Sequence, residues 1–424
     1  MSSELPPAPA AVRSRARNAH GTPPVRHGRL KHSHPVATVA KFLGAFVAVV
    51  AVSAASVAGY AVYDVASSIK PGITLEALPG KTVEAIPDLG AIDGGANILL
   101  AGTDTRTDQA GFTDKANQNA SSGAGNNDVT MLLHISADHT HAAIVSFPRD
   151  LIVPVPKCGN VGASSAVMFN TTLSRGGLSC TVLTVENMTG LDIQYAGEIS
   201  FDGVIAMSNA VGGVTVCLAT AVKDPYVGLN LAAGNQTLEG GTALAFLRSR
   251  HGVGDGSDLG RISNQQVFLS ALLRTITSAK VLSNPITVYS LAKAAVNNIQ
   301  LTTGLTSPTQ IASVALALKT VPLSSIVFVQ YPSAADPANA NRVVPISSAA
   351  SILNAALRAD QPLTLTGTVG RAAEADPSAT TAAPNPSGSA APETSASPAA
   401  SGVALPSSIT GQTASQQTCT KGNN

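Results

Sequence analysis

The chain has 424 residues, of which 12% are charged, and its formal net charge is +1. This length is ample for a sizeable buried core. Because there is no overall basic excess and no helix-turn-helix or zinc-finger spacing, the composition indicates no nucleic-acid partner. The four cysteines are widely spaced and include no C-x-x-C pair, which argues against a zinc or thioredoxin-type site.

The balanced net charge hides a basic N-terminus. Residues 1–41 hold seven Lys and Arg against the single acid Glu4, and their Pro- and Ala-rich composition predicts a disordered tail. Residues 42–63 then form a run of 22 residues without a charge, long enough to cross a bilayer as a helix. The basic flank favours a cytoplasmic N-terminus and an extracytoplasmic remainder. The alternative is a cleaved signal peptide, although the apolar core of such a peptide is typically about 7–15 residues long.

Residues 64–95 contain three prolines that interrupt any long helix, and we interpret them as a stalk. An extracytoplasmic location would be compatible with a disulfide among Cys158, Cys180 and Cys217, but the spacing leaves the pairing open.

Residues 96–358 predict a single folded domain. Short apolar runs predict strands at residues 97–102, 129–135, 142–147, 195–200, 214–218 and 325–330. Periodicity predicts helices at residues 181–188, 201–210, 263–277, 285–298 and 308–318. The loose alternation of the two patterns predicts an α/β fold with a mixed central sheet flanked by helices.

The last part of the chain, residues 359–424, is rich in Ala, Pro, Ser and Thr. Such a composition does not bury a core, so we expect a disordered tail that leaves Cys419 without a partner.

Charged residues stand at the ends of several apolar elements. Asp104 and Arg106 follow the first predicted strand, Asp128 precedes the second, and Arg149 follows the third. Two carboxylates at strand ends, Asp104 and Asp128, suit one Mg²⁺ ion, which usually takes one or two protein carboxylates together with water and phosphate oxygens.

The stretch from residue 238 to residue 268 places Arg248, Arg250 and Arg261 around a glycine-rich loop and a helix start. Guanidinium groups match phosphate oxygens, and a helix N-terminus favours anions, so this stretch suits a phosphorylated substrate. A salt-bridged surface loop is the alternative. We interpret Asp255 and Asp258, between these arginines, as residues that shape the loop.

Five segments resemble the LytR-CpsA-Psr (LCP) family, in order, from about Asn97 to Arg274. They are NILLAGTDTR, NNDVTMLLHI, SFPRDLIVPVP, FDGVIAMSNAVGGVTVCL and ALAFLRSRHGVGDGSDLGRISNQQVFLSALL. The resemblance implies a membrane-anchored, Mg²⁺-dependent phosphotransferase at the outer face of the membrane. Such an enzyme moves a glycopolymer from a polyprenyl-pyrophosphate carrier onto peptidoglycan through a phosphodiester.

The resemblance also implies roles for individual residues. Asp104 and Asp128 match aspartates that serve the metal and the pyrophosphate, and Arg149 matches a pyrophosphate-binding arginine. With Arg250 these three form the expected catalytic set. The residues expected to contact the substrate are Arg106, Arg149, Asn170, Arg248, Arg250, Arg261 and Gln265.

Two positions depart from the family pattern. Asn126 stands where the second motif usually has an arginine, and Met168-Phe169-Asn170 replaces the usual Lys-Ile-Asn. Both changes remove positive charge near the expected substrate. They leave two alternatives open: a non-catalytic binder of lipid-linked or wall glycans, and a hydrolase of lipid pyrophosphates.

The family has an apolar groove for the lipid, but periodicity does not separate a groove from a core. We expect residues 183–188 and 201–211 to be ordinary core. Teichoic acid, an arabinogalactan-like polymer and a capsule-like glycan all remain possible substrates.

Overall fold

A computed structural model of the chain describes residues 35–78, 94–107, 109, 118–119, 121–377 and 402–423. The expected basic tail lies almost wholly outside these residues. The chain divides into two compact units, residues 1–59 and 60–424. Helix α1, Pro35–Ser67, begins in the first unit and ends in the second, and none of its residues is buried. Among the described residues it is the one helix long and apolar enough to cross a membrane, and it extends past both ends of the expected 42–63 span.

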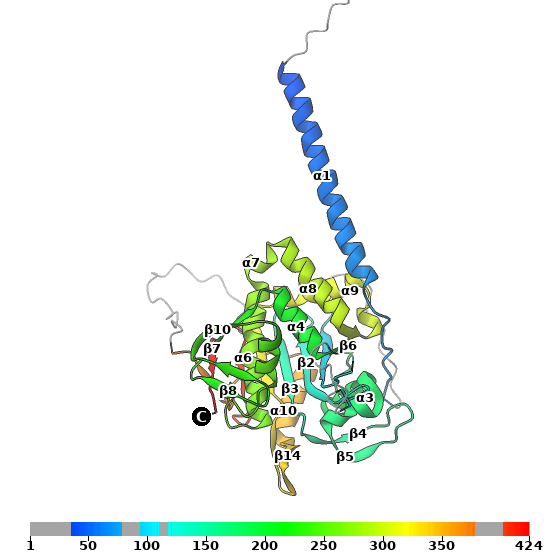
Figure 1. The fold of residues 1–424 in the computed structure, drawn as a ribbon. Helices are drawn as coiled ribbons and strands as arrows, with labels where there is room; N and C mark the ends of the chain where they lie inside the picture. The colour runs from blue at the N-terminus through cyan, green and yellow to red at the C-terminus, as the bar shows by residue number, and fades with distance from the viewer. Residues whose placement is uncertain are drawn as a thin grey trace, which may run out of the picture. The chain divides into compact units, whose positions relative to one another are not determined.

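A mixed sheet of seven strands forms the centre of the larger unit (Figure 1). Its order is β11-β6-β1-β2-β3-β12-β18, with antiparallel pairing from β1 to β2 and from β2 to β3. The parallel pairs are β1 with β6 and β3 with β12. The strand bounds are β1 Ala96–Thr103, β2 Asn127–Ile135, β3 Ala142–Phe147, β6 Tyr195–Ile199, β11 Ile299–Leu301, β12 Ile326–Gln330 and β18 Gly411–Thr413. The expected fold class and the six predicted strands, including β7 in the smaller sheet described below, are confirmed.

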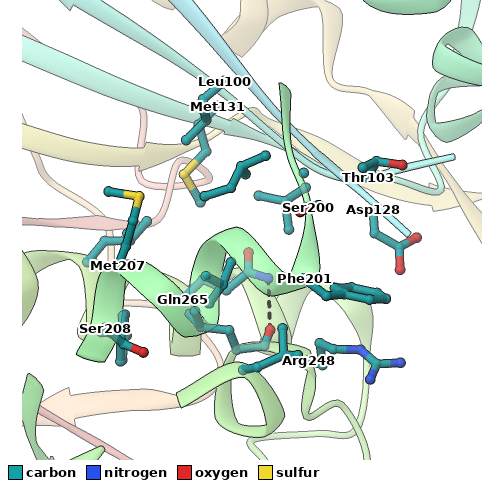
Figure 2. Close-up of a pocket in the computed structure, with 18 of the residues that line it drawn as sticks. Leu100, Thr103, Asp128, Met131, Ser200, Phe201, Met207, Ser208, Arg248 and Gln265 are labelled. Atoms are coloured by element: carbon teal, nitrogen blue, oxygen red, sulfur yellow. Dashed lines mark hydrogen bonds between the residues drawn. The ribbon is translucent and has the colours of Figure 1, made fainter. Parts of the chain in front are cut away.

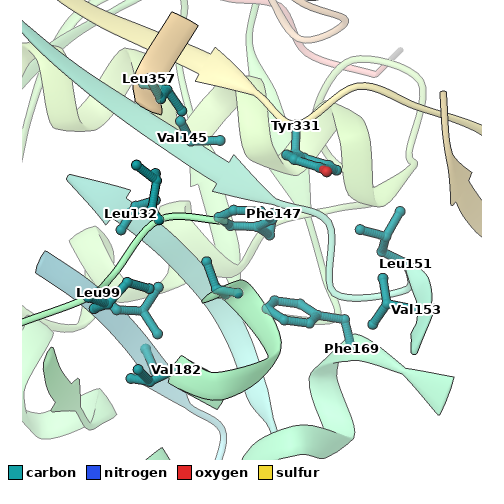
Figure 3. Packing of buried hydrophobic residues seen from close by; sticks show 14 of the residues in the cluster. Leu99, Leu132, Val145, Phe147, Leu151, Val153, Phe169, Val182, Tyr331 and Leu357 are labelled. Carbon is teal, nitrogen blue, oxygen red and sulfur yellow. The ribbon is translucent and has the colours of Figure 1, made fainter. Parts of the chain in front are cut away.

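Alternation along the strands sends side chains into two layers. Leu99 and Leu132 pack on one face of the sheet with Val182 and Leu357, from helices α3 (Thr172–Thr189) and α10 (Ser347–Arg358). Figure 3 shows this layer closing around Phe147. Successive β-strand residues point to opposite faces, so the neighbours of Leu99 and Leu132 face the other layer.

Six further helices, α4 to α9, belong to the domain. They are α4 Phe201–Ala210, α5 Gly240–Arg248, α6 Asp258–Thr277, α7 Ala279–Leu282, α8 Pro285–Asn298 and α9 Pro308–Thr320. All five predicted helices exist. Two of them begin earlier than predicted, because α3 includes the kinked Gly176-Gly177 segment and α6 begins at Asp258 behind the N-cap Ser257.

A smaller sheet and four two-stranded pairs complete the fold. The smaller sheet has the order β10-β7-β19-β16. Its strands are β7 Val214–Leu218, β10 Gly234–Leu238, β16 Ala373–Ala375 and β19 Thr418–Thr420. The pairs are β4 Ile152–Val155 with β5 Ser164–Met168, β8 Val222–Asp224 with β9 Leu229–Leu231, β13 Ser333–Asp336 with β14 Asn339–Pro345, and β15 Leu363–Thr364 with β17 Val403–Ala404.

The expected disordered tail is wrong for residues 359–377 and 402–423. Strand β18 pairs with β12 at the edge of the central sheet, and β19 pairs with β7. A disulfide joins Cys419 to Cys217, so Cys419 has a partner. These strands are only three residues long and rich in Thr and Gln, so the tertiary pairing and the disulfide, not local apolar periodicity, hold them. Residues 378–401 lie outside the described part.

The other disulfide joins Cys158 to Cys180. The expected stalk needs correction at its start, because residues 64–67 belong to α1 and the following segment lies against the domain. Ile73 pairs with Thr302, and the Glu76 amide donates to the Ser179 hydroxyl at 2.9 Å. The segment from Pro71 to Leu78 is therefore docked on the domain. Residues 79–93 are not described.

Candidate functional site

Strand pairing brings the expected site residues together. In the β1–β2 pair, Thr103 lies opposite Asn127, and the Asp104 amide donates to the Asn126 carbonyl at 2.9 Å, so Asp104 and Asp128 lie at the same end of the strand pair. In the β2–β3 pair, Thr130 lies opposite Phe147, so Arg149 lies beyond the same sheet edge. Residues distant in sequence thus meet because antiparallel neighbours begin and end at one edge.

Asp128 lies at the centre of this group. Its carboxylate forms a short ion pair with Arg149, and the Arg261 guanidinium donates to its backbone carbonyl at 2.7 Å. Burial raises the pKa of the Asp128 carboxyl. Arg261 and Arg149 oppose that shift, whereas the negative charges of Asp104 and Asp258 add to it.

Asp258 does more than shape its loop. It opens α6, and its carboxylate pairs with Arg261 at 2.7 Å while both side chains are buried. Its other oxygen accepts the backbone N–H of Arg149 at 3.2 Å. Asp258 therefore fixes both arginines beside Asp128. Asp255, by contrast, accepts hydrogen bonds from Ser257 within its own loop, as expected of a loop-shaping residue.

Arg248 and Arg250 face different cavities. Arg248 ends α5, and its guanidinium lies 4.5 Å from the centroid of the Phe201 ring. Ser249 has extended backbone angles (φ −59°, ψ 127°), which end the helix. Arg250 then lies near Asp150, with 3.7 Å between Nη2 and Oδ2. Arg248 lines the apolar pocket and Arg250 lines a neighbouring cleft; that both contact the phosphates of one substrate stays a prediction.

A buried carboxylate that the sequence analysis missed holds the Arg250 loop. Asp224 accepts hydrogen bonds from the Ser249 hydroxyl at 2.8 Å and from the amides of Arg250 and Gly252 at 3.1 Å each. Burial alone would raise the pKa of this carboxyl, but these hydrogen bonds lower it overall. Asp224 is thus a positioning residue. Local sequence carries no signal for this role, because these three partners lie 25–28 positions away.

An apolar pocket of about 200 Å³ lies between the sheet and helices α4, α5 and α6 (Figure 2). Leu100, Met131 and Phe201 line its interior, and Asp128 and Arg248 line its polar end. The expectation that residues 201–211 are ordinary core is therefore wrong for Phe201, Val204, Met207 and Ser208, which line this pocket. The stretch 183–188 does contribute to the core through Leu183 and Val185, which are fully buried, and Met188, whereas Asn187 is exposed.

Gln265 and Arg261 share a face of α6, as their spacing predicts, and both line the pocket. The Gln265 amide donates to the Leu247 carbonyl at 3.0 Å, which locks α6 against the end of α5 just before Arg248. Burial lowers the pKa of the Arg248 guanidinium, and the positive charges of Arg106 and Arg261 lower it further. The crowding of cations here favours an anion.

The remaining candidates support this centre. Asn170 is buried, and its backbone N–H donates to the Arg149 carbonyl at 3.0 Å, which holds the backbone at Arg149. Asn126 carries no charge to replace the family arginine. Its side-chain oxygen accepts from Ser174 at 3.1 Å. The charge of Arg106 acts on Arg248 from the neighbouring loop, which partly offsets the lost arginine.

Asp104 and Asp128 form a donor set that fits a hard cation. One oxygen of Asp104 accepts from the Asn126 amide at 2.7 Å and from Ser121 at 2.6 Å, which fixes the carboxylate at the sheet edge. The raised pKa of Asp128 reflects, in part, repulsion from Asp104, and a divalent ion between two carboxylates relieves such repulsion. Mg²⁺ is compatible with this chemistry.

The apolar pocket ends at Asp128, Arg248 and Arg261, a combination that suits an anionic group joined to an apolar chain. The LytR_cpsA_psr family model matches residues 73–357, and the chain belongs to this family.

Relatives and solved structures agree. The chain is 31% identical over 272 residues to the cell wall biosynthesis protein LcpA of Corynebacterium glutamicum, covering 57% of this chain and 52% of that protein. It is 26% identical to the polyisoprenyl-teichoic acid–peptidoglycan teichoic acid transferase TagT of Bacillus subtilis, covering 58% and 73%. A LytR-Csp2A-Psr enzyme from Actinomyces oris shares the fold, with a TM-score of 0.51, 23% identity and coverage of 68% and 96%. The match spans about half the length of LcpA.

Proposed function

We propose that this protein is a membrane-anchored phosphotransferase that moves a glycopolymer from a polyprenyl-pyrophosphate carrier onto peptidoglycan through a phosphodiester. The observation that carries the proposal is the apolar pocket that ends at Asp128, Arg248 and Arg261. An isoprenoid chain fits the pocket, and its pyrophosphate would then lie among the guanidiniums. The similarity to TagT, a polyisoprenyl-teichoic acid–peptidoglycan teichoic acid transferase, supports the same reaction class.

The proposed chemistry is a displacement at the phosphorus that bears the glycan. A peptidoglycan hydroxyl oxygen forms the new P–O bond, the bond to the lipid phosphate breaks, and lipid monophosphate leaves. Arg248 and Arg261 stabilise the charge that develops on the leaving phosphate, and Arg149 donates to the non-bridging oxygens of the attacked phosphate from the opposite side. Asp104 accepts the proton of the attacking hydroxyl. Mg²⁺ held by Asp104 and Asp128 would supply charge neutralisation.

The test is a transfer assay with full-length protein in detergent, a short-chain lipid-pyrophosphate glycan and Mg²⁺, with and without a peptidoglycan acceptor. We expect glycan joined to the acceptor by a phosphodiester, and lipid monophosphate in equal amount. Free glycan phosphate regardless of acceptor would make the protein a hydrolase. No product under any condition would make it a binding module.

We also propose that α1 spans the membrane with its N-terminus in the cytoplasm, because Lys and Arg are abundant before it. A reporter enzyme that is active only outside the cytoplasm, fused to the C-terminus, is expected to be active. Activity from an N-terminal fusion instead would reverse the orientation.

A further inference from the structure

A second cleft, of about 510 Å³, lies beside the site and is lined by four arginines (Arg149, Arg250, Arg342 and Arg371). We call it the arginine cleft. Arg342 comes from β14 in the hairpin that projects from the domain in Figure 1, and Arg371 follows α10. Arg342 lies outside the motifs recognised in the sequence. Arg371 also lies beyond the residues matched by the family model.

The charges in this cleft are unbalanced. Its lining includes two aspartates, Asp150 and Asp258, against the four arginines. Asp258 is engaged by buried Arg261. Asp150 is therefore the carboxylate that three of the arginines share, at 3.4 Å from Arg149, whereas Arg371 pairs with Asp255.

The other two contacts to Asp150 are long, at 3.7 Å from Arg250 and 3.8 Å from Arg342. At these separations the guanidiniums feel the carboxylate charge but do not form hydrogen bonds of normal length with it. Each keeps N–H donors for another oxygen ligand, and the net positive lining favours an anion.

The hairpin that carries Arg342 is fixed at its base. The Val343 amide donates to the Asp150 carbonyl at 3.2 Å, and Val343 forms a bridge with Leu151. Arg371 pairs with Asp255 at 2.7 Å, and both of these side chains are largely exposed. The cleft thus has one arginine on a fixed strand and one at its open rim.

The cleft and the apolar pocket have no lining residue in common. Two ion pairs separate them, Asp128 with Arg149 and Arg261 with Asp258, and each pair has one member in each cavity. In an in-line phosphoryl displacement, the nucleophile approaches opposite the leaving group. If the lipid phosphate leaves on the pocket side, the attacking hydroxyl enters from the arginine cleft.

We propose that the arginine cleft is the acceptor subsite, and that Arg342 and Arg371 bind carboxylates of the peptidoglycan acceptor. This inference rests on the proposed function for the identity of the acceptor. The recognised chemistry is an anionic substituent on a glycan, which the phosphates of a donor polymer also offer. The position opposite the lipid pocket favours the acceptor.

The test measures binding of soluble, uncrosslinked peptidoglycan oligomers to the full-length protein in detergent, without donor, by calorimetry. We expect the double variant Arg342→Gln/Arg371→Gln to bind the oligomers about tenfold more weakly, since two charge-assisted contacts are lost. Oligomers with amidated carboxyl groups are expected to bind the wild-type protein about as weakly as unmodified oligomers bind the double variant. Amidation should not weaken binding to the double variant any further. Arg342→Lys should recover part of the affinity.

Lys319→Gln is the matched control. It removes one positive charge from α9, away from both cavities, and is expected to leave binding unchanged. Thermal melting of each variant shows whether it is folded, and Arg342→Gln alone serves if the double variant is not.

Unchanged acceptor binding in a folded variant would overturn the proposal. So would weaker binding of a phosphate-rich donor with acceptor binding intact, which would assign the cleft to the donor polymer. Acceptor binding that depends on Arg342, in a protein that transfers nothing, would support the subsite while the proposed phosphotransfer fails.

Discussion

At the scale of single residues, the site depends on how its arginines and carboxylates are apportioned. Asp128 pairs with Arg149, and Asp258 pairs with Arg261. Each of these arginines is therefore held in place by a carboxylate. Burial and the neighbouring cations lower the pKa of Arg248, so an anion beside this guanidinium would stabilise its charged form. A pyrophosphate would complete this arrangement.

Asp128 sets a prediction for pH. Because burial raises its pKa, Asp128 becomes neutral at a higher pH than an ordinary aspartate with a pKa of 3.8. Protonation removes the negative charge that orients Arg149, so kcat/KM for transfer should fall as the pH drops through this raised value. A pH–rate profile measured on intact protein checks this. If kcat/KM instead stays constant from neutral pH down to below pH 4, the role of the ionised carboxylate is contradicted.

At the scale of elements, periodicity does not show whether helix α4 packs in the core or lines a pocket. An amphipathic helix presents the same pattern whether its apolar face meets a packed core or an open pocket. Phe201 and Met207 line an open pocket together with Gly102 and Val129 of the facing strands.

Filling the pocket should affect the lipid alone. In Val204→Trp, we expect KM to rise about tenfold or more for a long-chain polyprenyl donor, but little for a donor with one or two isoprene units. The control is Val288→Trp on the exposed part of α8. Equal effects on both donors would show that the chain does not enter this pocket.

The disulfide that holds the C-terminal strand β19 leads to a second prediction at this scale. The Cys217–Cys419 disulfide closes a separation of 202 residues, against 22 for Cys158–Cys180. In the chain-entropy description, the longer loop is worth about 5 kcal/mol and the shorter about 3 kcal/mol. The paired change to serine at Cys217 and Cys419 should therefore lower the denaturation midpoint more than the change at Cys158 and Cys180. The opposite order would mean that the C-terminal segment adds little to the fold.

At the scale of the molecule, the central sheet places two cavities on either side of one charged layer. The strands and most helices follow from local pattern, since 142–147 and 201–210 are bounded by turn residues and caps. The site residues Asp104, Asp128 and Arg149 follow from their places at strand ends.

Other features depend on contacts that no local pattern encodes. Strand β18 pairs with β12, and strand β19 pairs with β7. A disulfide joins Cys419 of β19 to Cys217 of β7. The separation of Arg248 from Arg250 follows from one extended residue after α5. Arg342 joins the site through long-range packing of its hairpin.

The central claim is tested most directly by comparing the wild-type protein with Arg149→Ala in the transfer assay, with ³¹P spectra of the purified acceptor. We predict a phosphodiester signal on the acceptor from the wild type. The rate should be at least about 100-fold lower in Arg149→Ala, because a preorganised hydrogen-bond donor to the phosphate oxygens is lost. A Lys319→Gln protein should match the wild type. Full transfer by a folded Arg149→Ala protein would contradict the assignment of the site.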